Sequence, residues 1–249
     1  MQTPFGLFGK KILITGASSG IGRSIAIECN KLGAEVFITG RNKHELDITF
    51  TRLVSTVGCD FFYGDLTLED VQNKLVDLLP VLDGIVHCAG ISEPKPFRFV
   101  NEEYVRKVFE INFFSPLFIT KKIIASKKLN NSSSIVFISS MVGNNCSFVG
   151  SSLYGATKSA VSGFIKGLAL ELAVKKIRVN SVLPGMIMTE LLSSSSLSTD
   201  DLSEDEKKYP LKRYGKPNEV AYAVIYLLSD ASCWVTGSEL LIDGGFTLN

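Results

Sequence analysis

Tyr154 and Lys158 are the two side chains whose types and spacing most directly suggest proton transfer. They lie four residues apart in Tyr-Gly-Ala-Thr-Lys, at the start of a predicted helix that runs to about Lys175. Residues four apart share one face of a helix, and a nearby ammonium favours the phenolate form of a phenol. Such a pair could serve as a general acid or base. Because Tyr-x-x-x-Lys is a common pattern, an exposed pair without function is the alternative.

Ser139 and Ser140 follow a continuous apolar run, residues 135–138, that predicts a buried strand. In an open parallel sheet, ligands bind beyond the carboxyl ends of the strands. A serine hydroxyl at this point could polarise a substrate carbonyl, whereas the plainer interpretation is an ordinary turn at the end of a strand. Each pattern is weak alone, but together with Tyr154 and Lys158 they indicate one site.

Residues 15–22, Thr-Gly-Ala-Ser-Ser-Gly-Ile-Gly, lie between an apolar run at 11–14 and a segment of helical periodicity. A strand, a glycine turn and a helix in this order direct backbone N–H groups at a phosphate, and the glycines let a pyrophosphate approach closely. The segment also matches Gly-x-Ser-x-Gly, the nucleophile motif of many hydrolases. Those enzymes need an acid and then a histidine later in the chain, but the only histidines are His44 and His87. A dinucleotide site is therefore favoured.

Seven short apolar, β-branched runs predict strands, and the amphipathic stretches between them are long enough for crossover helices. The runs are residues 11–15, 35–39, 60–64, 84–88, 134–139, 178–182 and 239–242. Their nearly continuous hydrophobicity is typical of parallel strands covered on both faces. No linker divides the chain. The sequence therefore predicts one α/β domain, residues 1–249, with a doubly wound (Rossmann) parallel sheet of seven strands and helices on both faces.

The composition argues against several classes of protein. The 249 residues carry a net charge of +1, which disfavours nucleic-acid binding. The longest apolar run, 221–228, is far shorter than the ~20 residues of a membrane span, and the first ten residues are too short for a signal peptide. The five cysteines form no CxxC pair and no Cys/His cluster for a metal. We therefore expect small buried thiols, no metal site and a cytoplasmic location.

The order of these motifs resembles the short-chain dehydrogenases/reductases over essentially the whole chain. Further segments carry the resemblance: His-Cys-Ala-Gly at 87–90, Asn112, Ser-Met-Val-Gly at 140–143, Pro-Gly-Met-Ile-Met-Thr at 184–189, Val-Thr-Gly at 235–237 and Ile-Asp-Gly-Gly at 242–245. The resemblance implies hydride transfer between a nicotinamide cofactor and a ketone or secondary alcohol. It also implies a catalytic tetrad of Asn112, Ser140, Tyr154 and Lys158. A non-catalytic dinucleotide sensor on the same fold is the alternative from another class.

The same resemblance implies a set of cofactor contacts: Gly16, Ser18, Ser19, Gly20, Ile21, Gly22, Arg41, Asp65, Leu66, Ala89, Gly90, Tyr154, Lys158, Pro184, Gly185, Ile187 and Thr189. Asp65 matches the position that contacts adenine. NAD-binding proteins place Asp or Glu about 20 residues after the glycines, whereas this chain has Gly40 and Arg41 there. A guanidinium can hold a 2′-phosphate through two hydrogen bonds, so NADP(H) is predicted. Stacking of Arg41 on adenine, which would favour neither cofactor, is the alternative.

The chain departs from the family pattern in two places. His87 and Cys88 replace the usual two asparagines, which is expected to loosen the hydrogen bonding beside the cofactor. Ser140 lies one residue further from Tyr154 than is usual, which lengthens the loop 143–150 and leaves Ser139 as an alternative to Ser140.

Pro116 bears on Asn112 independently of the resemblance. Proline lacks the N–H that would bond the carbonyl four residues earlier, which is that of Asn112. A freed carbonyl must find another partner, commonly an ordered water. The resemblance implies such a water, linking Lys158 to solvent as a proton relay, and a helix kink without function is the alternative.

Within the family, the chain most resembles the 3-oxoacyl-[acyl-carrier-protein] reductases, with sugar, polyol and steroid dehydrogenases as alternatives. An acyl carrier protein is acidic, so its reductase needs a basic docking surface. Basic residues cluster near two predicted helix ends, namely Lys121, Lys122, Lys127, Lys128, Lys175, Lys176 and Arg178. Lysines also favour helix C-termini through the helix dipole. Moreover, residues 130–134, Asn-Asn-Ser-Ser-Ser, stand where the acyl-carrier reductases often carry basic residues.

Two further expectations concern a lid and the assembly. Residues 190–212 hold a serine-rich run and an acidic stretch, which indicate either a substrate lid or a surface loop. The predicted helices at 112–128 and 152–175 carry more apolar residues than one buried face needs. Such a surplus commonly marks a subunit interface, and the family's tetramers pair these helices. We therefore expect a homotetramer, or a homodimer, acting on a small-molecule or acyl-carrier-linked carbonyl substrate.

Overall fold

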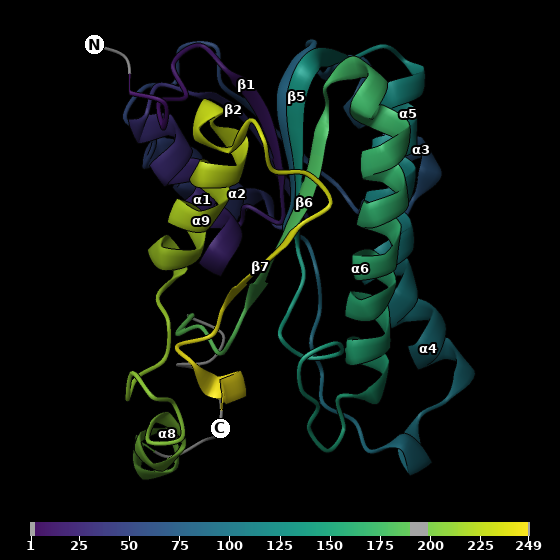
Figure 1. The fold of residues 1–249 in the computed structure, drawn as a ribbon. Helices are drawn as coiled ribbons and strands as arrows, with labels where there is room; N and C mark the ends of the chain where they lie inside the picture. The colour runs from purple at the N-terminus through teal and green to yellow at the C-terminus, as the bar shows by residue number, and fades with distance from the viewer. Residues whose placement is uncertain (1–2, 190–198, 249) are drawn as a thin grey trace.

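A parallel β-sheet organises the chain in the computed structural model, which describes residues 3–189 and 199–248. Its strands are β1 (Lys11–Thr15), β2 (Glu35–Gly40), β3 (Asp60–Tyr63), β4 (Leu82–His87), β5 (Leu129–Ile138), β6 (Arg178–Pro184) and β7 (Glu239–Ile242). Among the described residues the sheet has seven strands in the order β3-β2-β1-β4-β5-β6-β7, all parallel (Figure 1). The predicted strands and the doubly wound topology are confirmed.

Helices cover both faces of this sheet (Figure 1). One face carries α1 (Gly20–Lys31), α2 (Lys43–Thr51) and α9 (Pro217–Leu228), and the other carries α3 (Glu69–Leu78), α5 (Ser115–Ala125) and α6 (Ser152–Leu172). Helix α4 (Glu102–Phe109) precedes α5, and α8 (Thr199–Glu206) precedes α9. Side chains alternate across each strand, so Ile12 and Val136 enter the first core while Leu13 and Ile135 enter the second.

Strand β5 begins five residues earlier than the sequence predicts. Its first residue, Leu129, pairs with Leu82 of β4, and residues 130–132 are exposed. The Asn130 amide donates to Asp83 Oδ1 at 2.8 Å. Because this part of the strand is polar and solvated, it has no hydrophobic run from which a strand could be predicted.

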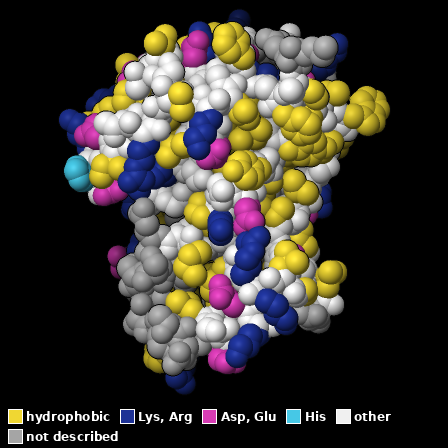
Figure 2. Space-filling model, turned by 90° about the vertical axis from the view of Figure 1, so that its left-hand side faces the viewer, with side chains coloured by type: hydrophobic (Ala, Val, Ile, Leu, Met, Phe, Trp, Pro, Cys, Tyr) yellow, Lys and Arg dark blue, Asp and Glu magenta, His cyan; other side chains and the backbone are white. Residues whose placement is uncertain are grey.

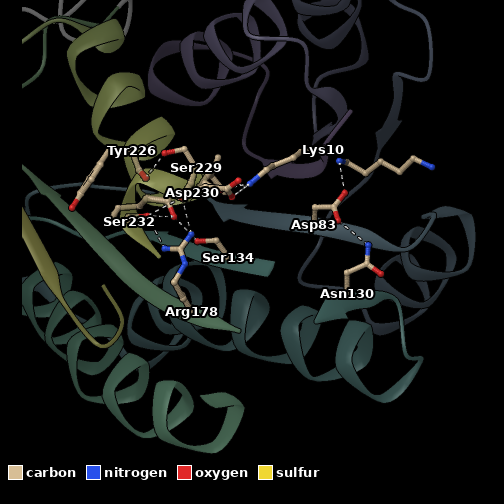
Figure 3. A network of polar contacts seen from close by, with 12 residues as sticks. Lys10, Asp83, Asn130, Ser134, Arg178, Tyr226, Ser229, Asp230 and Ser232 are labelled. Carbon is tan, nitrogen blue, oxygen red and sulfur yellow. Dashed lines mark hydrogen bonds and ion pairs between the residues drawn. The ribbon is translucent and has the colours of Figure 1, made fainter. Parts of the chain in front are cut away.

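The amino ends of the strands hold a polar network that caps the C-terminus of α9 (Figure 3). Ser134 Oγ donates to Leu227 O at 2.7 Å. Arg178, which is buried, donates to Ser229 O at 3.2 Å and to Ser232 Oγ at 2.8 Å. The last carbonyls of a helix lack intrahelical donors, so these contacts satisfy them. Arg178 therefore belongs to the interior and is not part of a basic docking surface.

The cysteines match the expectation of small buried thiols only in part. None of the five cysteines is in a disulfide, and burial raises the pKa of the Cys29 thiol well above its usual range, but Cys233 is exposed.

Within the candidate lid, residues 190–198 lie outside the described residues. The part that follows, residues 199–212, contains a buried Tyr209, whose ring lies 4.8 Å from that of Phe246 near the C-terminus. A lid function stays a prediction.

Two searches of the described residues gave negative findings. No helix in that part of the chain combines the length and the apolar character needed to span a membrane. The same part of the chain contains no group of three or more His, Cys, Asp or Glu side chains arranged to hold a metal ion.

Candidate active site

Tyr154 and Lys158 lie on one face of α6, as their spacing predicts. The Lys158 ammonium is 5.5 Å from the centroid of the Tyr154 ring. Lys158 is buried, and its Nζ donates to the carbonyl oxygen of Ile138, the last residue of β5, at 2.8 Å. Tyr154 is half-buried. The amino-terminal part of α6 is thereby fixed against the carboxyl end of a central strand.

The serines that follow β5 use their hydroxyls differently. Ser139 Oγ donates to the Lys158 carbonyl oxygen at 3.3 Å, which commits its hydrogen to the backbone of α6. Ser140 Oγ accepts a hydrogen bond from the Val142 N–H at 3.1 Å, and this leaves the hydroxyl hydrogen of Ser140 for another acceptor. Of the two, Ser140 is therefore the better donor to a substrate carbonyl.

The loop after Ser140 packs against the turn of α6 that carries the tyrosine. Gly143 has φ +121°, and a Cβ there would lie 2.7 Å from the Gly155 carbonyl oxygen. Only glycine fits both the conformation and the space. The loop that is predicted to be lengthened therefore lies against α6.

Asn112 connects three segments through its side chain. The Ile91 N–H donates to Asn112 Oδ1 at 2.8 Å, and Asn112 Nδ2 donates to Ile91 O at 3.0 Å and to Thr157 Oγ1 at 3.2 Å. Thr157 in turn donates to the Tyr154 carbonyl oxygen at 2.7 Å. The loop after β4, the helix that carries Asn112 and the tyrosine turn of α6 are therefore held together by one buried amide.

The helix around Asn112 is irregular, as Pro116 predicts. A π-helical turn, Glu110–Phe114, separates α4 from α5, and the Ser115 N–H bonds Glu110 O five residues back. Proline interrupts regular helical hydrogen bonding, and a π-turn is one way in which a helix accommodates the fault. The water relay that the resemblance implies stays a prediction.

The glycine turn lies against the loop after β4. Gly16 has φ +69°, and a Cβ there would come within 2.7 Å of the Ala89 backbone. The Thr15 hydroxyl oxygen accepts the N–H groups of Cys88 and Ala89 at 3.1 and 3.2 Å. A Cβ at Gly22 would lie only 2.2 Å from Gly16 O. The glycines of the motif are therefore required by close contacts within the turn and with the next loop.

The loop after β6 reaches the glycine turn from the other side. Pro184 O accepts the Met141 N–H at 3.1 Å, and the Gly185 N–H donates to Ile242 O at 3.0 Å. Ile187 forms a bridge with Gly215. At the far end, Thr189 Cγ2 is 3.3 Å from the position of a Cβ on Gly20. The structure thus brings the predicted segments at 16–22, 89–90 and 184–189 together at the carboxyl ends of the strands.

The end of β2 carries the residues predicted to select the cofactor. Arg41 is exposed, while Gly40 is buried and a Cβ there would lie 3.2 Å from Ser18 Oγ. Asp65 Oδ1 accepts the N–H and the hydroxyl of Thr67, so this carboxylate bonds its own turn. Leu66 beside it is buried, and its carbonyl accepts the Ser115 hydroxyl at 2.7 Å.

Two threonines in the site were not predicted from the sequence. Thr15 joins the glycine turn to the loop after β4, and Thr157 joins Asn112 to α6. The available signal for Thr157 was its position three residues after Tyr154, which turns a hydroxyl towards the same helix surface. No comparable pattern points to Thr15.

His87 fills the first of the two asparagine positions with a buried aromatic ring. Its Nε2 bonds Thr120 Oγ1 of α5 at 2.8 Å, and the ring stacks on Phe137 with centroids 4.7 Å apart. Among the described residues, Nδ1 has no hydrogen-bond partner. Burial lowers the pKa of His87 from 6.5 to about 3, so the ring is neutral. The His87 side chain thus makes one hydrogen bond and packs on an aromatic ring, and the expected loosening beside the cofactor stays a prediction.

Known proteins share this architecture. A family model described as enoyl-(acyl carrier protein) reductase matches residues 16–247. A short-chain dehydrogenase/reductase from Serratia marcescens is 26% identical, with a TM-score of 0.87 over 97% of this chain and 99% of that one. This chain belongs to the short-chain dehydrogenase/reductase family. Membership in that family makes it an oxidoreductase of carbonyl or alcohol groups that uses a nicotinamide dinucleotide.

The family relatives differ in their named substrates. The 3-oxoacyl-[acyl-carrier-protein] reductase of Rickettsia felis is 34% identical over 97% of this chain and 98% of that protein. The 7alpha-hydroxysteroid dehydrogenase of Escherichia coli is 31% identical over 96% of this chain and 94% of its own length. Similar identity to enzymes with unlike names means that similarity alone does not select a substrate.

Replacing His87 with Asn should make the stability less sensitive to acid. The folded protein keeps the imidazole neutral down to about pH 3, whereas the unfolded chain takes up a proton near pH 6.5. Between these values the unfolded state binds more protons, so the free energy of unfolding falls with falling pH by up to ~1.4 kcal/mol per pH unit. Urea unfolding at pH 7, 6 and 5 should show the smaller loss in H87N. Equal losses in both proteins would contradict a neutral, buried His87.

Proposed function

We propose that this protein is an NADP(H)-dependent carbonyl reductase or alcohol dehydrogenase with Asn112, Ser140, Tyr154 and Lys158 as its catalytic residues. The observation that carries the proposal is the position of Lys158. Its ammonium lies 5.5 Å from the Tyr154 ring centroid and bonds the carbonyl that ends β5, directly before the two serines. The Tyr154 phenol, the Lys158 ammonium that stabilises its anion and the available hydroxyl hydrogen of Ser140 thus all lie at the carboxyl end of β5.

The residues around the glycine turn fit a dinucleotide. The first N–H groups of α1 have no acceptors within the helix and suit a pyrophosphate. A Cβ on Gly90 would lie 3.3 Å from Asn112 Oδ1 and 3.7 Å from Lys158 Nζ, so glycine keeps this surface open beside the lysine. Arg41 would hold the 2′-phosphate. When bound, the nicotinamide supplies the hydride that reduces the carbonyl carbon.

The chain's own residues would handle the carbonyl oxygen and the proton. Tyr154 donates its phenolic proton to that oxygen, and the Ser140 hydroxyl donates a hydrogen bond to it. Lys158 stabilises the phenolate that results and holds the ribose hydroxyls of the cofactor. Asn112 keeps the tyrosine turn in register through Thr157, and its backbone carbonyl holds the relay water. In the oxidative direction Tyr154 accepts the proton.

A 3-oxoacyl group carried by an acyl carrier protein is the first substrate that we propose, because a relative of that name covers nearly the whole chain. The basic surface gives this choice limited support. Lys122 pairs with Glu69, Lys128 donates to three carbonyls at the end of α3, and Arg178 is buried. Four of the seven basic residues, Lys121, Lys127, Lys175 and Lys176, are exposed and available for docking.

Steroid, sugar and polyol dehydrogenases remain the alternatives for the substrate, since the 7alpha-hydroxysteroid dehydrogenase and a glucose 1-dehydrogenase of Gluconobacter oxydans are each 31% identical. A panel of acetoacetyl thioesters, ketosteroids and keto-sugars, assayed by NADPH consumption, separates these classes. Binding of NADPH without turnover of any carbonyl would favour the dinucleotide sensor instead.

A homotetramer, or a homodimer, is the assembly that we propose. Phe114 of the π-turn, Phe118 of α5 and Leu170 of α6 are exposed. A Cβ on Gly163 or Gly167 of α6 would meet nothing within 4 Å. Figure 2 shows the other side of the molecule, which carries α9, and hydrophobic side chains gather in its upper part. Tyr222 of α9 and Trp234 after it, which is 97% exposed, provide a second apolar area. Two separate interfaces are what a tetramer with perpendicular dyads requires.

Replacing Tyr154 with Phe should abolish turnover and leave NADPH binding nearly intact, because only the phenolic proton donor is lost. Steady-state kinetics and a fluorescence titration with NADPH measure the two effects separately. Activity of Y154F at a tenth of the wild-type rate or more would mean that Tyr154 is not the proton donor.

Replacing Arg41 with Ala should lower kcat/KM for NADPH by about 30- to 150-fold and leave kcat/KM for NADH nearly unchanged. Two charge-assisted hydrogen bonds to the 2′-phosphate, discounted for the exposure of Arg41, correspond to ~2–3 kcal/mol. The measurement is kcat/KM for both cofactors in both proteins. Equal losses with NADPH and NADH would leave Arg41 with stacking alone.

Light scattering at micromolar concentration should give a multiple of the 27.2 kDa chain mass, fourfold for the tetramer. Replacing Phe118 with Glu should reduce that mass, since a charge would be buried in the interface. Phe8, which is 80% exposed near the N-terminus, offers the matched control F8E, which should keep the wild-type mass. A wild-type protein of monomer mass would contradict the proposed assembly.

A further inference from the structure

A buried polar cluster lies directly behind the glycine turn. The Thr49 hydroxyl of α2 donates to Ala17 O at 2.8 Å and lies 3.0 Å from Glu45 O. The Arg23 guanidinium of α1 donates to Thr49 Oγ1 at 3.0 Å through Nε and to Ser18 O through Nη2. Thr49 is fully buried and Arg23 nearly so. Two consecutive carbonyls of the turn are thus held by side chains from two helices.

Glu45 balances the charge of this cluster. Its Oε2 lies 2.5 Å from Arg23 Nη2. A buried guanidinium without a carboxylate partner would be costly, so the pair lets a rigid cation sit beneath the turn. Glu45 belongs to the first turn of α2, which follows Arg41 and the N-cap Asn42. The cluster therefore ties the glycine turn to the segment that carries Arg41.

The direction of these carbonyls determines the direction of the next N–H groups. A peptide unit is planar, and in the trans form its C=O and N–H point opposite ways. No peptide bond among the described residues is cis. Since Ala17 O and Ser18 O are held inward by Thr49 and Arg23, the N–H groups of Ser18 and Ser19 point outward. They point away from the cluster, towards the side on which a pyrophosphate would lie.

We propose that Thr49 and Arg23 are positioning residues that preset the glycine turn for the pyrophosphate of the dinucleotide. Neither contacts the cofactor. They act through the Ala17 and Ser18 carbonyls, which they hold before the cofactor arrives, so binding does not have to order the turn. The inference rests on the proposed function, because it assumes that this turn receives the pyrophosphate.

The test compares three variants of α2. Thr49→Val keeps the shape of the side chain and removes its hydroxyl, which should raise the Kd for NADPH about tenfold by loosening the turn. Thr49→Ser restores the hydroxyl and should return the Kd to within twofold of wild type. Thr51→Val, at an exposed threonine that bonds only Ile48 O at 2.9 Å, is the matched control and should bind as the wild type does.

The Kd is measured by titration of folded protein, with near-ultraviolet circular dichroism to show that each variant is folded, and the KM for the carbonyl substrate should stay unchanged in T49V. A folded T49V with wild-type affinity for NADPH, or a T49S as weak as T49V, would overturn the positioning role while leaving the proposed function intact. A wild-type protein that binds neither NADPH nor NADH would overturn both.

Discussion

The hydrogen bond between the Lys158 ammonium and the Ile138 carbonyl is the contact on which the site depends. A buried ammonium needs an acceptor, and a carbonyl at the end of a strand has lost its neighbour in the ladder. The hydrogen bond satisfies both groups, and it fixes the position of α6 relative to β5. Tyr154, one turn before the lysine, and Ser140, two residues after the carbonyl, take their places from it.

The sheet and most of the candidate site could be predicted because both follow from short-range patterns. The buried strands are continuous apolar runs, and Pro116 indicates a disturbed helix at the place where the π-turn lies. The polar start of β5 has no such pattern. Thr15, Arg23 and Thr49 could not be found either, because their contacts join helices and turns that spacing along one segment does not relate.

The basic residues show that a cluster of positive charge in a sequence does not by itself predict a docking surface. Lys128 donates to three carbonyls where α3 ends, and Arg178 caps α9 from the start of β6. Both satisfy carbonyl groups that a helix leaves without donors. In the sequence alone, the same residues resemble part of a basic docking surface. Only the fold distinguishes a cation that faces solvent from one that completes a helix.

The close approach of Gly40 to Ser18 couples these two positions in any change of coenzyme. A side chain at position 40 would begin 3.2 Å from the Ser18 hydroxyl oxygen, closer than most real contacts. An acidic residue at that position, of the kind that NAD-binding proteins carry, would therefore require the Ser18 side chain to shift by a few tenths of an ångström. A smaller residue at position 18 would remove that contact, so the acceptance of a carboxylate at position 40 depends on the residue at position 18.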